Sequence, residues 1–256
     1  MKDFTFYQGG NALAYAEFGE PNGYPVLIQH GMIASIDDGE GLFRRLIHAG
    51  ARLISIARPG YGDSSPYLMR NVAEWGDMVA VLVDELGLPQ FDVFGISSGA
   101  PYAYAIGQRF PDRARNLFIL SGIPALYDER VQALWPYPVN KNATIPEMQT
   151  LAYDLFFARL AKEDLEKADI KDSMRNDCCG PAQDLRIRAM DWGFTLADVK
   201  PKVYMRHSTA DIFAAAELTA RLLPNCEFEA RENDVHFSQD VLDDFIETVI
   251  AAHIGK

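Results

Sequence analysis

One serine of this chain stands where its hydroxyl could act as a nucleophile. Ser97 is the middle residue of a Gly-Ile-Ser-Ser-Gly segment, residues 95–99, at the end of an apolar run that begins at Phe91. Residues 91–96 predict a buried strand, and residues 100–110, which carry small side chains near their start, predict a helix. A serine on such a strand-to-helix turn stands clear of the sheet, and the next backbone N–H is free to bind an oxyanion.

A serine hydroxyl is a weak nucleophile at neutral pH, so a catalytic Ser97 requires a histidine as base and an acid that orients the histidine. Of the five histidines, His236 is the best base, because it lies in a polar loop between the last predicted strand and the last predicted helix. His207 ends a strand, and a structural hydrogen bond to the backbone is its simpler interpretation. His48 and His253 lie in predicted helices and are expected to face solvent.

Asp211 is the predicted acid, because it follows the predicted strand 203–205 and would project from the same edge of the sheet as the other two residues. Taken alone, Asp211 would be better explained as the cap of the helix that begins near Phe213. Asp234 is a weaker candidate, since a residue two positions before His236 rarely bends back to reach Nδ1. The chain order serine, aspartate, histidine is the one expected of a particular α/β fold.

Short apolar runs predict the strands that position these residues. Residues 4–8 and 12–18 alternate around a Gly-Gly-Asn turn and predict an antiparallel hairpin at a sheet edge. Five short apolar runs follow, and helical spacing separates the early ones; the runs are 26–29, 53–57, 91–96, 117–120 and 203–205. This alternation predicts an α/β fold with a mainly parallel central sheet, helices on both faces, and ligands at the carboxyl ends of the strands.

The alternation stops between residues 123 and 198, where helical stretches and several aromatic residues replace the strands. We interpret this segment as a helical lid, inserted after the sixth strand, that covers the mouth of the pocket. For any single aromatic residue of the segment, packing onto the core is the simpler explanation. The α/β core then comprises residues 1–122 and 199–256.

Composition limits the partners of the protein. The formal net charge is −12 and no block of basic residues occurs, which argues against nucleic acid or an anionic membrane surface. No apolar stretch is long enough for a signal peptide or a membrane span, and three cysteines, two of them adjacent, argue against a disulfide framework. We therefore expect a cytoplasmic protein whose partner is a small-molecule substrate. No metal or other cofactor is expected, and the oligomeric state is left open.

With these residues in place, the chain resembles the α/β-hydrolase family over nearly its whole length except the lid. The segment His30-Gly31-Met32 is similar to the family's oxyanion loop, which implies that the backbone N–H of Met32 joins that of Ser98 in an oxyanion hole. Residues 58–64 are similar to the family's glycine-rich loop, which shapes the floor of the pocket. Serine at the nucleophile position disfavours the dehalogenase and epoxide hydrolase branches, which use aspartate there.

The resemblance and the ordered triad predict a carboxylesterase-like serine hydrolase. Ser97 would attack the carbonyl carbon of an ester or related acyl group, and the aromatic lid suggests a small to medium apolar substrate. One alternative keeps the site for cofactor-free cleavage of a carbon–carbon bond, with His236 as base and Ser97 positioning the substrate. Another is a non-catalytic, ligand-binding member of the fold.

Overall fold

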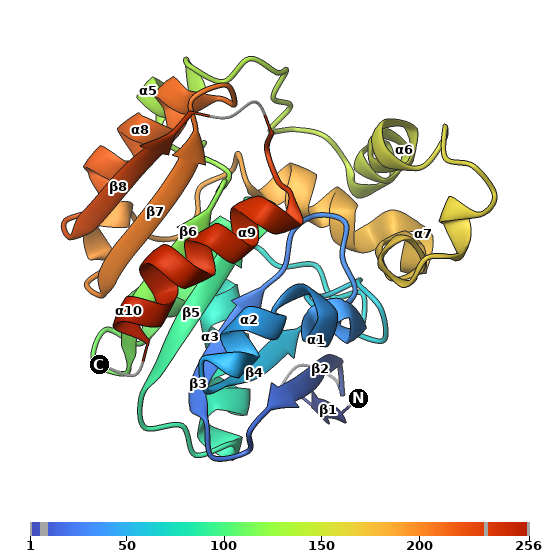
Figure 1. The fold of residues 1–256 in the computed structure, drawn as a ribbon. Coiled ribbons are helices and arrows are strands. Elements are labelled where there is room, and N and C mark those ends of the chain that lie inside the picture. The colour runs from blue at the N-terminus through green and yellow to red at the C-terminus, as the bar shows by residue number, and fades with distance from the viewer. Residues whose placement is uncertain (1, 6–9, 233–234, 255–256) are drawn as a thin grey trace.

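The structure is a computed structural model that describes residues 2–5, 10–232 and 235–254 (Figure 1). These residues contain one eight-stranded sheet with the strand order β1-β2-β4-β3-β5-β6-β7-β8. The strands are β1 Lys2–Thr5, β2 Ala12–Gly19, β3 Tyr24–Gln29, β4 Ala51–Ile56, β5 Phe91–Ile96, β6 Ala114–Leu120, β7 Lys202–Ser208 and β8 Cys226–Arg231.

Strand β2 pairs antiparallel with both β1 and β4, and every other neighbouring pair in the sheet is parallel. The predicted α/β fold with a mainly parallel sheet and an N-terminal antiparallel hairpin is confirmed. The first strand starts earlier than predicted, at Lys2, and residues 6–9, which the hairpin prediction includes, lie outside the described residues. The carboxyl ends of β3, β5 and β7 share one edge, as parallel pairing requires.

Helices cover both faces of the sheet. The side chains of each central strand point to both faces, and the helices bury them on each side. Phe91 and Val93 of β5 pack with α3 (Ala73–Glu85) and α4 (Ala100–Arg109). Phe94 and Ile96 pack on the other face. That face is covered by α1 (Gly39–Leu42), α2 (Arg44–His48) and α9 (Gln239–Phe245), and then by a π-helical turn (Ile246–Ile250) and α10 (Ala251–His253). Because both faces are buried, the strands are nearly continuous apolar runs in the sequence.

The segment after β6 is helical, as predicted, and its described residues contain no strand. It contains α5 (Glu129–Gln132), α6 (Ile145–Phe156) and α7 (Ala168–Ile187), and α6 and α7 project together at one end of the molecule (Figure 1). Helix α7 is kinked, because residues 175–178 leave helical geometry and three of them have positive φ. The segment then returns to the core, and α8 (Phe213–Leu222) follows β7.

The inserted segment packs against the core through apolar side chains. Met148 and Ala152 of α6 and Ala182 of α7 form a cluster with Met32, which follows β3. This is the location that the lid prediction requires, and a covering role stays a prediction. Among the helices of the described residues, none combines the length and apolar character needed to cross a bilayer.

Candidate active site

Ser97 occupies a strained turn between β5 and α4. Its φ is 50°, a left-handed conformation that costs free energy for a residue with a side chain. The turn needs small neighbours: a Cβ on Gly95 would lie 2.8 Å from Cβ of Ala103, and a Cβ on Gly99 would overlap the carbonyl oxygen of Gln29. The glycines two residues before and after Ser97 therefore let the strand and the helix approach each other, as the sequence predicts.

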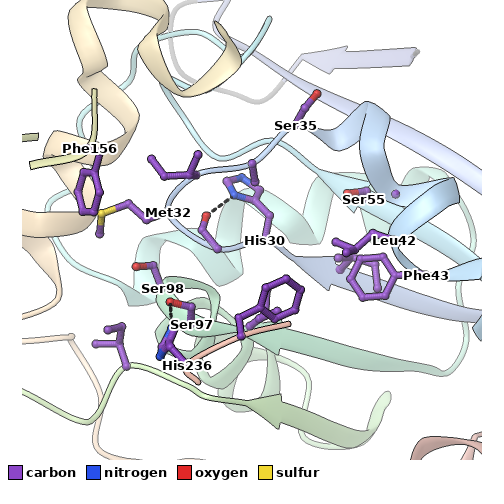
Figure 2. A pocket seen from close by; sticks show the side chains of 18 of the residues that line it. His30, Met32, Ser35, Leu42, Phe43, Ser55, Ser97, Ser98, Phe156 and His236 are labelled. Atoms are coloured by element: carbon purple, nitrogen blue, oxygen red, sulfur yellow. Dashed lines mark hydrogen bonds between the residues drawn. The ribbon is translucent and has the colours of Figure 1, made fainter. Parts of the chain in front are cut away.

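The three predicted triad residues come together in the structure. Nε2 of His236 lies 2.9 Å from Oγ of Ser97, and Nδ1 of His236 lies 2.5 Å from Oδ2 of Asp211. Figure 2 shows the imidazole of His236 beside Ser97 at the pocket. Helix α8 has Ile212 at its N-cap and no side-chain cap, so Asp211 contacts the histidine and does not cap the helix. Asp234, the weaker candidate for the acid, lies outside the described residues.

A second histidine lies against the same carboxylate. His207 is fully buried at the end of β7, and its Nε2 is 3.4 Å from Oδ2 of Asp211. Neither ring nitrogen of His207 has a directed hydrogen bond within the described residues, so the predicted bond to the backbone is wrong. Burial raises the pKa of Asp211, but the contacts with His207 and His236 outweigh it and hold this pKa well below its ordinary value. Asp211 therefore faces His236 as a carboxylate.

The predicted oxyanion loop begins where β3 ends, and Ser97 lies beside it. A Cβ on Gly31 would lie 3.9 Å from Cβ of Ser97. Nε2 of His30 accepts a hydrogen bond from the backbone N–H of Arg58 at 3.2 Å, and its Nδ1 lies 2.7 Å from the carbonyl oxygen of Gly31. This pattern places the proton on Nδ1. Burial and the charge of Arg58 lower the pKa of His30 well below its ordinary value, so the imidazole is neutral and structural.

A buried guanidinium holds the carbonyl groups of this loop. Arg58 donates to the carbonyl oxygens of His30 and Gly31 at 2.6 and 2.9 Å. In a trans peptide the C=O and the N–H point in opposite directions, so fixing the carbonyl of Gly31 aims the N–H of Met32 away from Arg58. This N–H has no backbone acceptor within the described residues. Besides its predicted role in shaping the pocket floor, Arg58 thus holds the segment that we predict to be the oxyanion loop.

Arg58 is in turn held by Asp184 of the inserted segment. Nη2 of Arg58 lies 2.6 Å from Oδ2 of Asp184, and both side chains are at most 2% exposed. The hydroxyls of Tyr61 and Tyr102 donate to the same carboxylate at 2.8 and 2.6 Å. We call Arg58, Asp184, Tyr61 and Tyr102 the buried clamp. The sequence alone does not predict this role of Asp184, because 126 residues separate it from Arg58 and no local pattern links the two.

A cavity of about 400 Å³ opens beside Ser97 and His236. Its walls are mostly apolar, and in Figure 2 Met32 and Phe156 lie on one side of it and Leu42 and Phe43 on another. Phe156 comes from α6, so the inserted segment contributes to the wall. Trp192 of the same segment is a core residue, as the simpler explanation predicts, because it is fully buried and its ring lies near those of Tyr104 and Tyr127, whereas Tyr137 and Tyr153 are exposed.

The cysteines and the remaining histidines are the other side chains that could be considered as metal ligands. Within the residues that the structure describes, no cluster of three histidine, cysteine or acidic side chains could hold a metal ion. Burial raises the pKa of Cys178 and of Cys179, so both thiols stay protonated near neutral pH.

His48 is exposed as predicted. His253 differs, because its Nδ1 lies 3.1 Å from the hydroxyl of Tyr204 and the two rings stack.

The sequence is similar to those of known hydrolases. Residues 24–192 match the family described as alpha/beta hydrolase fold. An uncharacterized hydrolase, YcgS, of Bacillus subtilis is 29% identical over 44% of the chain, and a proline iminopeptidase of Xylella fastidiosa is 31% identical over 59%. The matched parts are 39% and 52% of those proteins, so the chain spans about half or less of the curated relatives it matches.

The fold is also found among solved structures. The crystal structure of a probable hydrolytic enzyme from Pseudomonas aeruginosa superposes with a TM-score of 0.71 and covers 98% of this chain and 92% of its own. The sequence identity between the two chains is 16%, so the likeness concerns the fold alone.

Proposed function

Because the chain belongs to the α/β-hydrolase fold family, we propose that it is a carboxylesterase-like serine hydrolase that cleaves an ester or a related acyl bond through an acyl-enzyme. One observation carries the proposal. His236 lies within hydrogen-bond distance of both Ser97 Oγ and Asp211 Oδ2, through its two different ring nitrogens. This is the connection that makes a serine hydroxyl reactive, since the base that accepts its proton is itself held by an acid.

The proposed reaction has two halves. Ser97 Oγ bonds to the carbonyl carbon while its proton passes to Nε2 of His236, and the backbone N–H groups of Met32 and Ser98 stabilise the oxyanion. The bond to the leaving group then breaks, and His236 returns the proton to that group. In the second half His236 takes a proton from water, the hydroxide adds to the acyl carbon, and Ser97 regains its proton as the acid product leaves.

We propose that residues 123–198 act as a lid over this site, while residues 1–122 and 199–256 form the catalytic core. Phe156 of α6 and Arg188 at the end of α7 both line the cavity beside Ser97. A segment that contributes wall residues near the nucleophile excludes water when closed, which strengthens the electrostatic stabilisation of the oxyanion. The apolar wall supports a small to medium acyl chain, and a small molecule is the partner we propose.

Replacing the nucleophile tests the proposal. We expect Ser97→Ala to lower kcat/KM for short-chain 4-nitrophenyl esters by several orders of magnitude, with an unchanged melting temperature. Ser65→Ala is a matched control, because the hydroxyl of Ser65 accepts a hydrogen bond from the backbone of Ala12 and lies outside the site. Undiminished ester turnover by Ser97→Ala would overturn the proposal.

A burst experiment separates the proposed hydrolase from the two alternatives. A hydrolase should release a burst of 4-nitrophenolate equal to the concentration of enzyme, because the acyl-enzyme accumulates with an activated ester. A fluorophosphonate that labels Ser97 without any burst or ester turnover would favour carbon–carbon cleavage. Tight binding of a small ligand without turnover, unaffected by Ser97→Ala, would favour a non-catalytic protein. Amides and thioesters of the same acyl groups extend the assay to the related acyl bonds.

A further inference from the structure

One of the residues that line the cavity, Arg188, carries a charge that the proposed chemistry does not use. Arg188 follows directly after α7 and lines the cavity together with Ser97 and His236. Burial lowers the pKa of Arg188, and the charge of Asp184 opposes this lowering. A guanidinium nevertheless stays protonated at any ordinary pH. Arg188 therefore adds a partly desolvated positive charge to a mostly apolar set of lining residues.

Within the described residues, the Arg188 guanidinium has neither a carboxylate within 4 Å nor a hydrogen-bond acceptor. Its one described side-chain partner is the indole of Trp135, whose ring centroid lies 5.3 Å from Cζ. The indole N–H of Trp135 is itself buried and lacks an acceptor in this part of the chain. Two adjacent donors are therefore without an oxygen to bind.

The nearest carboxylate cannot serve Arg188, because it is already in use. Asp184 lies one helical turn earlier, and its two oxygens accept hydrogen bonds from Arg58, Tyr61 and Tyr102. The other buried guanidinium of the described chain is paired as well, since Arg206 contacts Glu229 and Asp244. Leaving a cation partly buried and unpaired costs free energy. Arg58 and Arg206 are paired with carboxylates, and Arg188, which lines the cavity, is the exception among the three.

We propose, on the basis of the hydrolase function above, that Arg188 binds a carboxylate of the substrate. The preferred substrates would then be esters that carry a carboxylate close to the scissile carbonyl, such as monoesters of short dicarboxylic acids. The planar guanidinium matches a carboxylate with two parallel N–H donors. The apolar wall would contact the carbon chain between the two groups. The substrate would then not be purely apolar, contrary to what the sequence suggests, because one end of the molecule would be anionic.

Matched pairs of esters test the proposal. One pair is 4-nitrophenyl pentanoate and 4-nitrophenyl hydrogen glutarate, which differ by a carboxylate on the acyl side. The other is phenyl acetate and 3-carboxyphenyl acetate, which differ on the leaving-group side. We expect Arg188→Met to lower kcat/KM for the carboxylate ester of at least one pair by about 10- to 100-fold, the usual worth of a charged hydrogen bond. The neutral ester should change by less than about 3-fold, and Arg188→Lys should recover part of the loss.

Arg186→Met is the matched control, because Arg186 lies two residues earlier in α7 and lines a different surface hollow. It should leave both members of each pair unchanged. Equal losses for neutral and carboxylate esters in Arg188→Met would show a merely structural role and overturn the proposal. Unchanged kinetics for all four esters would also overturn it.

A binding measurement keeps this proposal separate from the proposed hydrolase function. Glutarate and benzoate should raise the melting temperature of the wild-type protein and of Ser97→Ala, and should have no effect on Arg188→Met. If no ester is cleaved but this pattern is observed, the hydrolase proposal fails and the carboxylate site stands. If esters are cleaved but neither acid binds and no pair discriminates, the carboxylate site fails and the hydrolase proposal stands.

Discussion

Asp184 and Asp211 each gather several donors around one carboxylate, in two regions of the molecule that differ in burial and in the kind of donor. Asp184 is 2% exposed and is bound by the guanidinium of Arg58 and by two tyrosine hydroxyls. Asp211 is 24% exposed and contacts two histidines, of which His236 is 41% exposed and His207 is fully buried. One carboxylate is enclosed by the protein, whereas the other lies on a loop beside a cavity.

The donors decide what each region can do. A guanidinium keeps its charge at any ordinary pH, and burial raises the pKa of Tyr61 and of Tyr102 well above the ordinary value. The buried clamp therefore keeps one protonation state and holds a loop in place. An imidazole can accept a proton on one ring nitrogen while the other donates to a carboxylate, so the region around Asp211 suits proton transfer. The same acidic group thus supports structure in one place and is proposed to support chemistry in the other.

Removing the charge of Asp211 should have the largest effect on activity. We expect Asp211→Asn to lower kcat/KM for 4-nitrophenyl esters by about 10³- to 10⁴-fold, because an amide no longer stabilises the imidazolium or fixes its tautomer. The melting temperature should fall moderately, because the ionised carboxylate also stabilises the fold, and the protein should stay folded at the assay temperature. A loss smaller than about 10-fold, measured with the same esters, would show that Asp211 is not the acid of the triad.

Removing the charge of Asp184 should act on stability first. We expect Asp184→Asn to lower the free energy of unfolding by about 3–5 kcal/mol, since the guanidinium of Arg58 would stay buried without a counter-charge. Urea denaturation measures this change. The double variant Arg58→Met with Asp184→Asn should be more stable than Asp184→Asn alone. If the second substitution adds a further loss, the charge of the clamp is not the cause.

The pH dependence of stability should report the ionisation of Asp211. Because the folded protein holds the pKa of Asp211 below its unfolded value, the ionised group stabilises the fold above about pH 4, and this contribution is lost as the pH falls. The difference in unfolding free energy between wild type and Asp211→Asn should therefore shrink between about pH 5 and about pH 3. Urea denaturation at several pH values would show it, and a constant difference would contradict the assignment.

An exposed pair gives the smallest expected effect and a matched control for the clamp. Asp77 Oδ1 lies 2.9 Å from Nε of Arg109, but their side chains are 60% and 47% exposed. We expect Asp77→Asn to change the free energy of unfolding by less than about 1 kcal/mol. Both variants replace an aspartate that pairs with an arginine. A larger loss of unfolding free energy in Asp184→Asn therefore measures the effect of burial. Similar losses in the two variants would remove that distinction.

Local patterns were enough to predict the sheet and to select the residues of the candidate site. Apolar runs marked the strands, and parallel pairing then brought Ser97, Asp211 and His236 to one edge, where the structure finds them in contact. The predicted domain boundaries and the lid remain predictions. The observed strand ends differ from the predicted ones by a few residues, because backbone pairing continues beyond the apolar positions, as in β7.

The rest depends on contacts that no local pattern records. Asp184 lies within a helical stretch in which an acidic residue is ordinarily solvated, and only the folded chain brings it to Arg58. The position of His207 near a strand end predicts a hydrogen bond to the backbone, yet its Nε2 lies 3.4 Å from Oδ2 of Asp211. Arg188 was not singled out in the sequence, since its unusual feature is a missing partner in three dimensions.

The buried clamp has a consequence for how a substrate would meet the site. Asp184 ties the end of α7 to the loop that holds Met32, and separating them would strip a desolvated cation of its counter-charge. Whatever part of the inserted segment moves, the end of α7 is thereby kept with the core. If the segment His30–Met32 is the oxyanion loop that we propose, the buried clamp fixes its conformation in advance, and little of a substrate's binding free energy would be needed to shape it.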